Sequence, residues 1–431
     1  MNPTIGYVGM THLGLCSAAA AAAHGFAVIG YDPDAGLVSR LRAGDLPVVE
    51  PGLPELIASC GRLEFSADGT MLARCDVVYI AADVPTDDAG RSDLTGIERL
   101  IAGASERLRP DAVLVVLSQV PPGFTRAQRH ASERLYYQVE TLVFGCAVER
   151  ATRPERFLVG CSRPSDPLPP AYRAFLDAFA CPVLPMRYES AELCKISINL
   201  CLVASISAAN SLAALCERIG ADWSEIVPGL RLDRRIGMHA YLAPGLGLSG
   251  GNLERDLATL GMLSARTGAS NAFVSACVEL SAQRRDWPLR VLRESLDLSS
   301  ARVGVLGLAY KPGTASIKGS PAFALLASLH CASVRAYDPV VQADLPSGVE
   351  RAASALEACR DADAVVVMTP WDELRALRLQ SLAQVMKGRL IVDPYRALDP
   401  RACAAEGLRH CTLGEGAPST RDRGDSKCWS T

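Results

Sequence analysis

The chain lacks the cysteine spacing that would indicate a disulfide framework or a zinc ribbon. Its 15 cysteines are odd in number and scattered, and no pair follows a CxxC pattern. It also lacks an excess of charge of one sign. A net charge of −3 and a pI of about 6.1 argue against nucleic acid or an anionic membrane as the main partner. We therefore expect a cytoplasmic protein with reduced thiols, no metal and no nucleic-acid partner.

Long hydrophobic runs are also missing, because none reaches the length that we expect of a bilayer span. The alanine run at residues 18–23 resembles the core of a signal peptide, but it has no basic leader and is followed at once by a patterned α/β segment. We interpret it as a buried helix of a βαβ unit. With 431 residues, 49% hydrophobic and 21% charged, the chain is typical of a soluble globular protein of two or three domains.

The first third of the chain alternates apolar strands with amphipathic helices, which predicts a parallel, doubly wound sheet. The expected strands are Thr4–Gly9, Ala27–Tyr31, Val77–Ala81, Ala112–Leu117 and Phe157–Val159. A long helix then covers residues 190–218 and ends at Gly220. A second alternating unit begins at Arg302 with RVGVLGLAY, and VRAYDP, AVVVMT and LIVDP follow as strands.

These patterns predict an α/β protein with two Rossmann-like, doubly wound domains joined by a long central helix and a helical middle domain. We expect an N-terminal α/β domain at residues 1–187, the central helical domain at 188–298 and a second α/β domain at 299–410. Residues 411–431 lack apolar periodicity and are predicted to be a disordered tail.

A dinucleotide-binding fingerprint follows the first strand. Gly9, Thr11 and Gly14 occupy the three positions of GxGxxG, with threonine in place of the second glycine. Asp32 closes the next strand, where an acid bonds the ribose hydroxyls of NAD and disfavours the extra phosphate of NADP. The hydroxyl of Thr11 is expected to donate to a phosphate oxygen. The pattern predicts NAD as the cofactor, with His12 and Leu13 completing the turn; a bare glycine turn is the competing interpretation.

Four stretches resemble motifs of the UDP-glucose/GDP-mannose dehydrogenase family. They are PGLGLSGGNLERD (244–256, for PGxGFGGSCFPKD), VPTDDAGRSDL (84–94, for VPTP…GxDL), SQVPPGFT (118–125, for STVPPGTT) and AELCKISIN (191–199, for AExxKYxxN). The resemblance extends to about Pro400. It implies that Val84, Pro85, Thr86, Ser118 and Gln119 contact the cofactor, and Gln119 departs from the family's threonine.

The resemblance also implies a catalytic group. Asn252 stands where the family carries the cysteine that captures the half-oxidised substrate. Lys195 and Asn199 lie four residues apart and share a helix face. Lys195 is our choice for the group that takes or shares a proton, although a lone lysine on a helix is normally a solvated charge. Asp256 is expected to pair with Lys195 or a water, and a helix N-terminal cap is its alternative role. Glu149, in AVERATRPERF, is assigned to the family's glutamate.

Binding of a nucleotide-diphosphate sugar is assigned to a third group of residues: Arg235, Tyr241, Gly247, Gly250, Lys311 and Lys318. Lys318 replaces the family's arginine. A guanidinium group, which can donate two parallel hydrogen bonds to a phosphate, is thus replaced by an ammonium group, which acts as a point charge. Asp338 imitates a ribose-binding acid, but its domain has no complete glycine fingerprint. We expect a nucleotide-sugar domain there, and a homodimer through the long helix, which carries the apolar residues Leu200, Val203, Ile206 and Leu212.

An amide is not a usable nucleophile, so the sequence favours redox chemistry that stops after two electrons. The favoured function is a nucleotide-sugar epimerase that acts through a transient carbonyl and regenerates NAD. Three alternatives stay open: a dehydrogenase that releases the aldehyde or ketone, a four-electron dehydrogenase that makes a uronic acid through a hydrate, and a non-catalytic nucleotide-sugar-binding protein.

Overall fold

The computed structural model describes residues 2–87, 90–249 and 251–416, and the chain separates into two compact units, Met1–Asn199 and Leu200–Thr431. The helix α7 (Tyr188–Ile219) runs through the boundary between them. The predicted domain limits at 187 and 298 stay predictions.

The first unit is built on an eight-stranded sheet in the order β3-β2-β1-β4-β5-β6-β7-β8. The strands are β1 (Thr4–Val8), β2 (Ala27–Tyr31), β3 (Leu63–Ser66), β4 (Val77–Ile80), β5 (Val113–Val116), β6 (Leu135–Gln138), β7 (Phe157–Cys161) and β8 (Val183–Arg187). The central strands are continuous apolar runs buried on both faces, as parallel strands require. The five predicted strands are therefore confirmed, while β3, β6 and β8 were missed.

One pairing departs from the predicted parallel sheet. β6 and β7 are antiparallel, with Tyr137 opposite Gly160, whereas the other neighbouring strands are parallel. The chain between β6 and β7 carries only the short helix α5 (Ala147–Thr152). Strand β7 therefore starts at the end of the sheet where β6 stops. An antiparallel pair needs no crossover connection of the kind that joins parallel strands.

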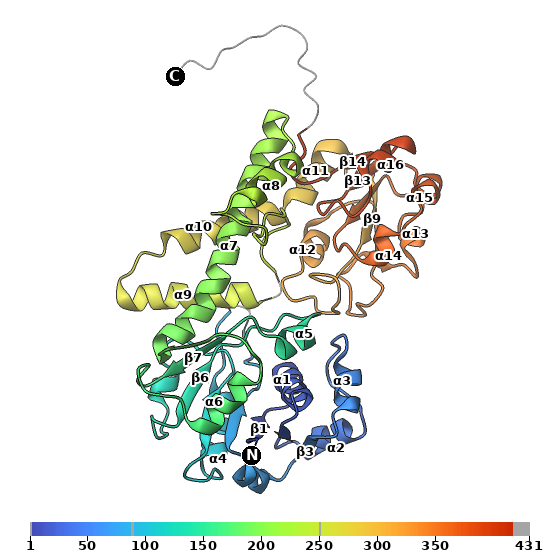
Figure 1. Cartoon of the computed structure of the whole chain (residues 1–431). Coiled ribbons are helices and arrows are strands. Elements are labelled where there is room, and N and C mark those ends of the chain that lie inside the picture. The colour runs from blue at the N-terminus through green and yellow to red at the C-terminus, as the bar shows by residue number, and fades with distance from the viewer. Residues whose placement is uncertain (1, 88–89, 250, 417–431) are drawn as a thin grey trace, which may run out of the picture. The chain divides into compact units, whose positions relative to one another are not determined.

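Helices cover both faces of this sheet. The alanine-rich α1 (His12–Ala23) is buried nearly all round, because its small side chains let it pack closely between the sheet, α3 and α5. This confirms the predicted buried helix, and Figure 1 shows α1 and α3 side by side. The same face carries α2 (Ala35–Arg42), α3 (Leu53–Ser59) and α6 (Pro170–Asp177). The other face carries the 3-10 helix η1 (Gly69–Arg74), α4 (Thr95–Ser105) and the start of α7.

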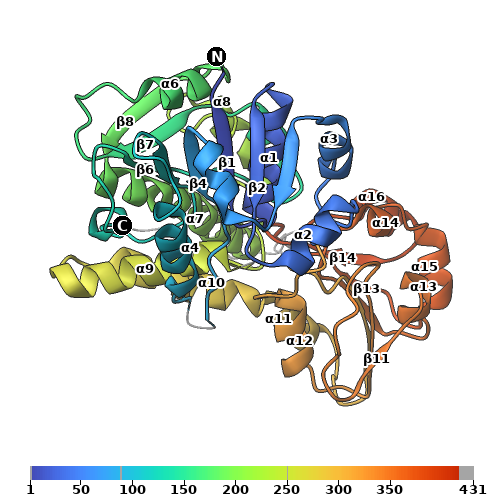
Figure 2. The same cartoon turned by 90° about the horizontal axis from the view of Figure 1, so that it is seen from below.

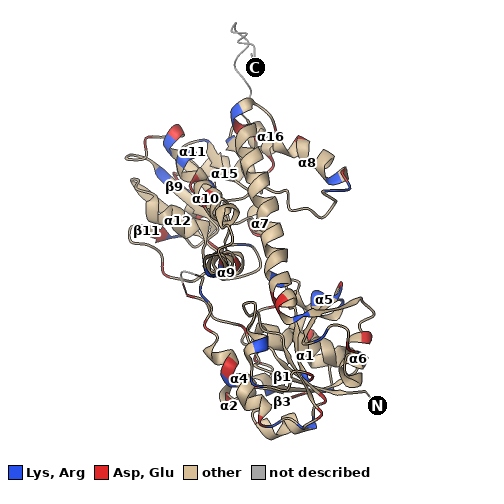
Figure 3. Cartoon of the chain, turned by 90° about the vertical axis from the view of Figure 1, so that its left-hand side faces the viewer, with Lys and Arg blue, Asp and Glu red and all other residues tan. Residues whose placement is uncertain are grey.

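The helix α7 ends at Gly220, whose φ of 78° is left-handed, as the sequence predicts for a C-terminal glycine. Residues 196–216 carry no charge, and Figure 3 shows the helix almost entirely in tan between charged ends. In the described part of the chain it is therefore the one helix that could cross a membrane by length and composition alone. This corrects our expectation that no apolar run is long enough to span a bilayer. The run was missed because its many serine and alanine residues make it look less apolar than a typical membrane span. A core helix passes the same test.

The second unit begins with α7 residues and continues with α8 (Trp223–Leu232), α9 (Asn252–Thr267), α10 (Ala272–Arg285) and α11 (Trp287–Ser295). Val203 of α7 is buried with Leu248, Leu257 and Cys277, and Leu200 and Ile206 pack against them. Part of the apolar surface of α7 is thus covered within its own unit. Leu212 and Leu215 remain about half exposed.

A six-stranded parallel sheet in the order β11-β10-β9-β12-β13-β14 forms the rest of the second unit. Its strands are β9 (Arg302–Leu306), β10 (Ser333–Tyr337), β11 (Val349–Arg351), β12 (Ala364–Val367), β13 (Leu390–Val392) and β14 (Arg409–Cys411). Figure 2 shows α11 and α12 (Pro321–Ser328) on one side of the sheet and α13 (Ala355–Ala358) and α15 (Leu379–Val385) on the other. The short helices α14 (Asp372–Arg375) and α16 (Pro400–Ala405) join the second side.

The predicted tail starts too early. Cys411 ends β14, Leu413 is buried, and the backbone carbonyl of Gly414 accepts the N–H of Trp223. Arg396 also pairs with Glu415. Residues 411–416 are therefore part of the folded unit, and the remaining residues of the predicted tail, 417–431, lie outside the described part of the chain.

Candidate active site

The first turn of α1 is shaped by two glycines. A Cβ at Gly14 would lie 1.9 Å from the carbonyl oxygen of Gly9, and a Cβ at Gly9 would lie 2.6 Å from the Cβ of Ala82. Gly9 also has a φ of 93°. Helix α1 thus approaches the end of β1 too closely for any other residue, and its N-terminus has no side-chain cap and no acid in its first turn. Uncapped N–H groups at a helix N-terminus are suited to the pyrophosphate of a dinucleotide.

Asp32 lies at the end of β2, beside this turn. Its Oδ2 accepts the backbone N–H of Met10 at 2.8 Å, and its Oδ1 accepts that of Asp34 at 3.0 Å. A carboxylate has about four acceptor positions, so room remains for ribose hydroxyls. The glycines, the uncapped helix and the half-buried acid together fit NAD.

Two side chains of the fingerprint, Thr11 and His12, bond to other parts of the protein. The hydroxyl of Thr11 accepts the N–H of Asp83 at 2.9 Å and lies 3.5 Å from the carbonyl oxygen of Ala81. It ties the turn to the loop after β4, and donation of its proton to a phosphate oxygen stays a prediction. His12 is buried and its Nε2 lies 2.9 Å from Glu50, so only its backbone faces the helix N-terminus.

Glu50 is a residue that the sequence analysis missed. It is buried and also accepts the N–H groups of Gly145 and Ala147, at 3.0 and 2.8 Å. Burial alone would raise its pKa, but the Gly145 N–H, His12 and the Ala147 N–H together hold the pKa of Glu50 below its usual value. Glu50 therefore fastens the segment before α5 to the start of α1.

The two proline-rich loops follow β4 and β5 at the carboxyl edge of the sheet. Val84 is buried, Pro85 is exposed with its carbonyl accepting the N–H of Asp93, and Thr86 forms a β-bridge with Ser92. Ser118 is fully buried and donates its hydroxyl to the carbonyl of Ala82 at 2.6 Å, so its side chain is turned into the protein. Gln119 is half-buried. These backbones line the sheet edge where a dinucleotide binds.

The second of these loops is held by Glu192, which the sequence motif contained but to which we assigned no role. It is fully buried in α7 and accepts the N–H groups of Gly123 and Thr125 at 2.6 and 2.8 Å. Burial raises the pKa of Glu192 despite these two bonds, which lower it. The start of α7 and the loop after β5 are thus one connected piece.

Lys195 is paired with Glu140, a residue to which the sequence analysis assigned no role. Its Nζ lies 3.2 Å from Oε2 of Glu140, and both side chains are largely buried. Glu140 in turn accepts the N–H of Leu142. Glu149, the residue assigned from the sequence, is exposed on α5. Glu140 was not singled out from the sequence, because only the fold shows which carboxylate reaches the lysine.

Asn199 lies one turn further along α7 and is half-buried like Lys195. The two side chains therefore share a face of the helix, as their spacing predicts. Their roles in catalysis stay predictions.

In the second unit, the glycine-rich loop before α9 is held by α10. Gly247 has a φ of 82°, and a Cβ there would lie 2.5 Å from the carbonyl oxygen of Ser281. The hydroxyl of Ser281 accepts the N–H of Leu248 at 2.7 Å, while Arg285 donates to the Leu248 carbonyl and lies 3.7 Å from Glu254. The loop backbone is thus fixed by groups that the sequence motif did not contain. Gly250, predicted to bind substrate, lies outside the described residues.

Asn252, which the sequence motif assigns to the family's cysteine position, is the first residue of α9 and is exposed. Asp256 lies one turn on, 2% exposed, with Oδ1 3.4 Å from Nε of Arg255. The alternative of Asp256 as an N-terminal cap is wrong, because α9 is capped by Gly251 and Asp256 is inside the helix. Asp256 is thus a buried acid one turn from Asn252, and its role in catalysis stays a prediction.

Lys318 lies beside the same helix start. A Cβ at Gly251 would lie 3.0 Å from Cε of Lys318, so the lysine packs directly over the turn that precedes Asn252. Lys311 is half-buried, with Nζ 5.8 Å from the ring centre of Tyr310. Arg235 and Tyr241 are exposed, and Arg235 pairs with Asp233. Among the predicted substrate residues of this unit, the structure thus brings Lys318 to the loop and leaves Arg235 at the surface.

Asp338 does not imitate a ribose-binding acid. Its carboxylate accepts five protein donors: the N–H groups of Leu308, Ala309, Val340 and Val341 and the indole N–H of Trp371. It is 5% exposed. Asp338 therefore has no open acceptor position for a ribose, and the absence of a second NAD site stays a prediction.

Models of three domains of one family match this chain. They are described as the NAD binding domain (residues 3–166), the central domain (189–283) and the UDP binding domain (304–400) of the UDP-glucose/GDP-mannose dehydrogenase family. Together they cover most of the sequence.

Curated relatives and solved structures agree with these models. The chain is 31% identical to the UDP-glucose 6-dehydrogenase of Rhizobium meliloti over 94% of this chain and 98% of that protein. It is also 31% identical to the UDP-glucose 6-dehydrogenase of Haloferax volcanii over 94% and 99%. The structure of a UDP-glucose dehydrogenase from Pyrobaculum islandicum superposes with a TM-score of 0.84 at 27% identity, covering 97% of this chain and 98% of that one.

Proposed function

Because this chain belongs to the UDP-glucose/GDP-mannose dehydrogenase family, we propose that it oxidises a nucleotide sugar with NAD in a single two-electron step. The restriction to one two-electron step rests on Asn252, the first residue of α9, which lies at the cysteine position of the family motif. A thiolate can capture an aldehyde and carry it to a thioester, whereas a carboxamide cannot. The overall class, an NAD-dependent nucleotide-sugar dehydrogenase-family enzyme, does not depend on this limit.

The chemistry of this step divides between the cofactor and the chain. NAD, when bound, accepts the hydride. The first turn of α1 and Asp32 would hold the dinucleotide, and the Lys195–Glu140 pair would take the hydroxyl proton of the substrate. Asn199, on the same face of α7, would orient the reacting oxygen.

The fate of the carbonyl separates two enzymes. In an epimerase, the hydride and the proton return to the sugar after the carbonyl presents its other face, or after exchange at the neighbouring carbon, and NAD is regenerated. In a simple dehydrogenase, the carbonyl leaves and one NADH accumulates per sugar. We favour the epimerase, because a free carbonyl is a reactive product. A four-electron reaction through a hydrate is the less favoured third outcome.

A non-catalytic binding role is disfavoured by the Lys195–Glu140 pair. Bringing a lysine and a carboxylate together in a largely buried site costs desolvation free energy, which mere binding of a nucleotide sugar would not require. The substrate class follows from the family and its UDP binding domain, and UDP-glucose is the first candidate because the curated relatives are named for it. We place the reaction in the cytoplasm.

The decisive experiment combines product analysis with mass spectrometry. The parent enzyme, NAD and a panel of UDP-sugars are incubated while NADH absorbance and sugar NMR are followed. We expect at most one NADH per sugar, no uronic acid and no covalent sugar adduct on the quenched protein. Two NADH per sugar would overturn the two-electron limit, and exchange of sugar protons without NADH would select the epimerase.

A matched pair of lysine variants tests the acid–base assignment. Lys195→Ala should lower turnover by ~10²–10⁴ while leaving nucleotide-sugar affinity nearly unchanged, because removal of a positioned acid–base group has that typical cost. Lys387→Ala, which removes an exposed lysine paired with Asp363, is the control. Equal turnover of the two variants would contradict the mechanism.

We also propose a homodimer through the uncovered part of α7. Leu212, Leu215 and Ile219 are 45, 50 and 62% exposed, so an apolar strip remains after α9 and α10 have covered Val203. The double variant Leu212→Asp, Leu215→Asp should give a monomer mass by light scattering at low micromolar protein, while Val49→Asp, at a 92% exposed valine elsewhere, should not. A monomeric parent would refute the dimer.

A further inference from the structure

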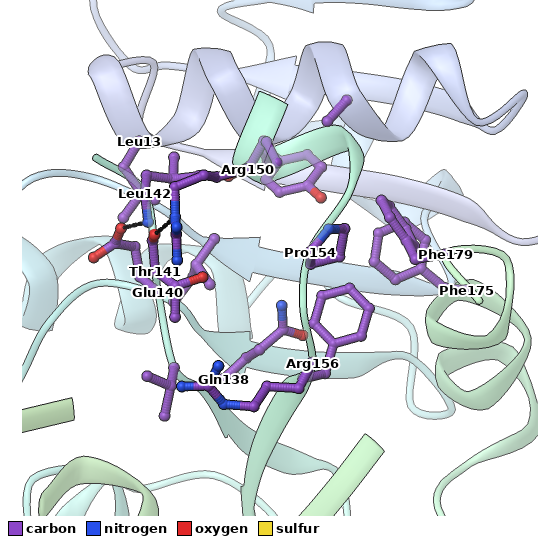
Figure 4. Close-up of a pocket in the computed structure, with 17 residues that line it drawn as sticks. Leu13, Gln138, Glu140, Thr141, Leu142, Arg150, Pro154, Arg156, Phe175 and Phe179 are labelled. Carbon is purple, nitrogen blue, oxygen red and sulfur yellow. Dashed lines mark hydrogen bonds between the residues drawn. The ribbon is translucent and has the colours of Figure 1, made fainter. Parts of the chain in front are cut away.

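A small cavity lies within the first unit, between the sheet and helices α1 and α6. Its volume is about 50 Å³, and Figure 4 shows Gln138, Glu140, Arg150 and Arg156 around it. Its lining combines apolar rings with polar groups from five segments; the polar or charged members are Tyr7, Ser17, Gln138, Glu140, Thr141, Arg150 and Arg156. A cavity of this size has room for about three or four waters, and too little for a metabolite.

Two of these polar side chains, those of Gln138 and Tyr7, are buried and indicate that the cavity holds a ligand. The oxygen end of the Gln138 amide accepts the hydroxyls of Tyr79 and Tyr172, each at 3.0 Å, so its other end is left for the cavity. Gln138 is 7% exposed and Tyr7 3% exposed. Within the described residues, no protein group bonds the Gln138 amide nitrogen or the Tyr7 hydroxyl, although both side chains line the cavity.

Leaving such groups without partners would cost about 1–3 kcal/mol each, so buried polar groups of this kind normally hold ordered water. Burial raises the pKa of Tyr7 far above its ordinary value, which keeps its hydroxyl protonated and able to donate. A water placed here would find the Tyr7 hydroxyl, the Gln138 amide and the Ser17 hydroxyl as partners, within the two to four that a buried water needs.

The cavity also connects the catalytic pair to the surface. Glu140, which holds Lys195, is part of the lining. Arg150 and Arg156 are about one-third exposed, and both contact Glu155, which lies outside the lining. Arg150 also donates to the carbonyl of Thr141, one residue from Glu140. The lining thus runs from the buried glutamate to partly exposed side chains.

We propose that this cavity holds a cluster of ordered waters that carries protons between the Lys195–Glu140 pair and solvent. The inference rests on the proposed function. When hydride leaves the substrate carbon, the proton of the substrate hydroxyl passes to Lys195. At the same time the Lys195 ammonium group gives one of its protons to the Glu140 carboxylate. Glu140 then gives that proton to a cavity water, and the excess proton leaves through the cluster. The pair returns to ammonium and carboxylate, and no further reactant is needed.

The test uses variants that alter the waters without touching the catalytic pair. Tyr7→Phe removes only the hydroxyl of a tyrosine that lines the cavity, and Ala20→Val adds two methyl groups to a lining residue of α1. Tyr136→Phe removes a hydroxyl of the same sheet that donates to Glu133 and does not line the cavity, so it is the matched control. Far-UV circular dichroism and NAD affinity establish that each variant is folded.

The primary measurement is the rate of NADH formation in a single turnover, in water and in deuterium oxide, across pH. Tyr7→Phe and Ala20→Val should slow the step about tenfold at neutral pH and change the solvent isotope effect, since a relay contributes only part of the usual gain from acid–base catalysis. Tyr136→Phe should behave as the parent. Recovery of the Tyr7→Phe rate by small diffusible buffer bases would strengthen the inference.

A high-resolution crystal structure of the parent is the second measurement, and should show water within hydrogen-bond distance of Tyr7 and Gln138. A dry cavity, or parental rates and isotope effects in both variants of an active enzyme, would overturn the relay and leave the proposed function standing. A parent enzyme with no turnover on any nucleotide sugar would overturn the proposed function and the relay with it, whatever the cavity contains.

Discussion

The two sheets of this protein begin in the same way and end as different sites. In the first unit Gly9 has a φ of 93° and donates its N–H to Tyr31 at 2.9 Å; in the second, Gly307 has a φ of 92° and donates to Tyr337 at 2.7 Å. The next N–H bonds the aspartate that follows the neighbouring strand, Asp32 or Asp338, at 2.8 or 2.7 Å. The local backbone is thus repeated.

The segments after these two glycines differ. After Gly9, helix α1 starts at His12, so its uncapped N-terminus meets the sheet edge beside a half-buried Asp32. After Gly307, the chain runs through a loop and α12 begins only at Pro321. Trp371 and four backbone N–H groups then surround the Asp338 carboxylate.

A glycine and an acid at strand ends therefore do not suffice for a dinucleotide site. The helix must start at once, and the acid must keep free acceptor positions. Asp32 meets both conditions, whereas Asp338 is a structural anchor of its loop. Three substitutions test this difference, from the largest expected effect to the smallest.

The close approach of α1 gives the largest effect. Gly14→Ala would put a Cβ 1.9 Å from the Gly9 carbonyl, so the helix must shift away from the strand. Overpacking of this kind costs about 3 kcal/mol, so we expect NAD affinity to fall by roughly 10²-fold in calorimetric titration. Gly96→Ala is the control, since Gly96 also lies in a helix of the first unit but nothing lies within 4 Å of a Cβ there. Equal NAD affinities of the two variants would show that the close helix approach is not needed for NAD binding.

Asp338→Asn should instead weaken the second unit. The substitution replaces one carboxylate oxygen, which accepts hydrogen bonds, by an amide NH₂ group, which donates them. Because five donors surround this side chain, we expect the unfolding free energy to fall by about 2 kcal/mol. Urea unfolding followed by tryptophan fluorescence measures this, because Trp371 donates to Asp338. NAD affinity should stay at the parental value. A loss of NAD affinity with unchanged stability would mean that Asp338 binds the cofactor after all.

The same aspartate gives a pH dependence. Burial would raise its pKa, but the N–H groups of Leu308, Val341 and Val340 and the Trp371 indole hold the pKa of Asp338 below its usual value. A lowered folded-state pKa contributes stability above the unfolded value of about 3.9, and this is lost as pH falls through the folded pKa. The parent should therefore lose stability below about pH 4 more steeply than Asp338→Asn. Parallel curves would contradict this.

The smallest effect concerns cofactor choice. The parent should bind NAD more tightly than NADP, because the Asp32 carboxylate would repel the ribose phosphate. Asp32→Ser should reduce the preference by about tenfold, or 1.4 kcal/mol. Titration with both cofactors measures it, and a parent that binds both equally would show that Asp32 does not face the ribose.

Much of this site could be read from the chain because its motifs are local. Glycines, strand ends, the four-residue spacing of Lys195 and Asn199 and the asparagine at the cysteine position all lie within short stretches. The partners of these groups are remote in sequence. Glu140 rather than Glu149 meets Lys195, and Glu50 and Glu192 hold loops far along the chain, so no local pattern could find them.

The sequence by itself determined the two α/β sheets and the family, and it is the basis of the proposal that the cysteine is missing, because periodicity and short motifs are properties of neighbouring residues. Only the tertiary structure decided which acids are open and which are saturated, where the Thr11 hydroxyl bonds, and that Tyr7, Gln138 and Glu140 share one cavity. These depend on distances between segments that the chain separates by tens of residues. Burial and hydrogen-bond saturation exist only once those segments are packed.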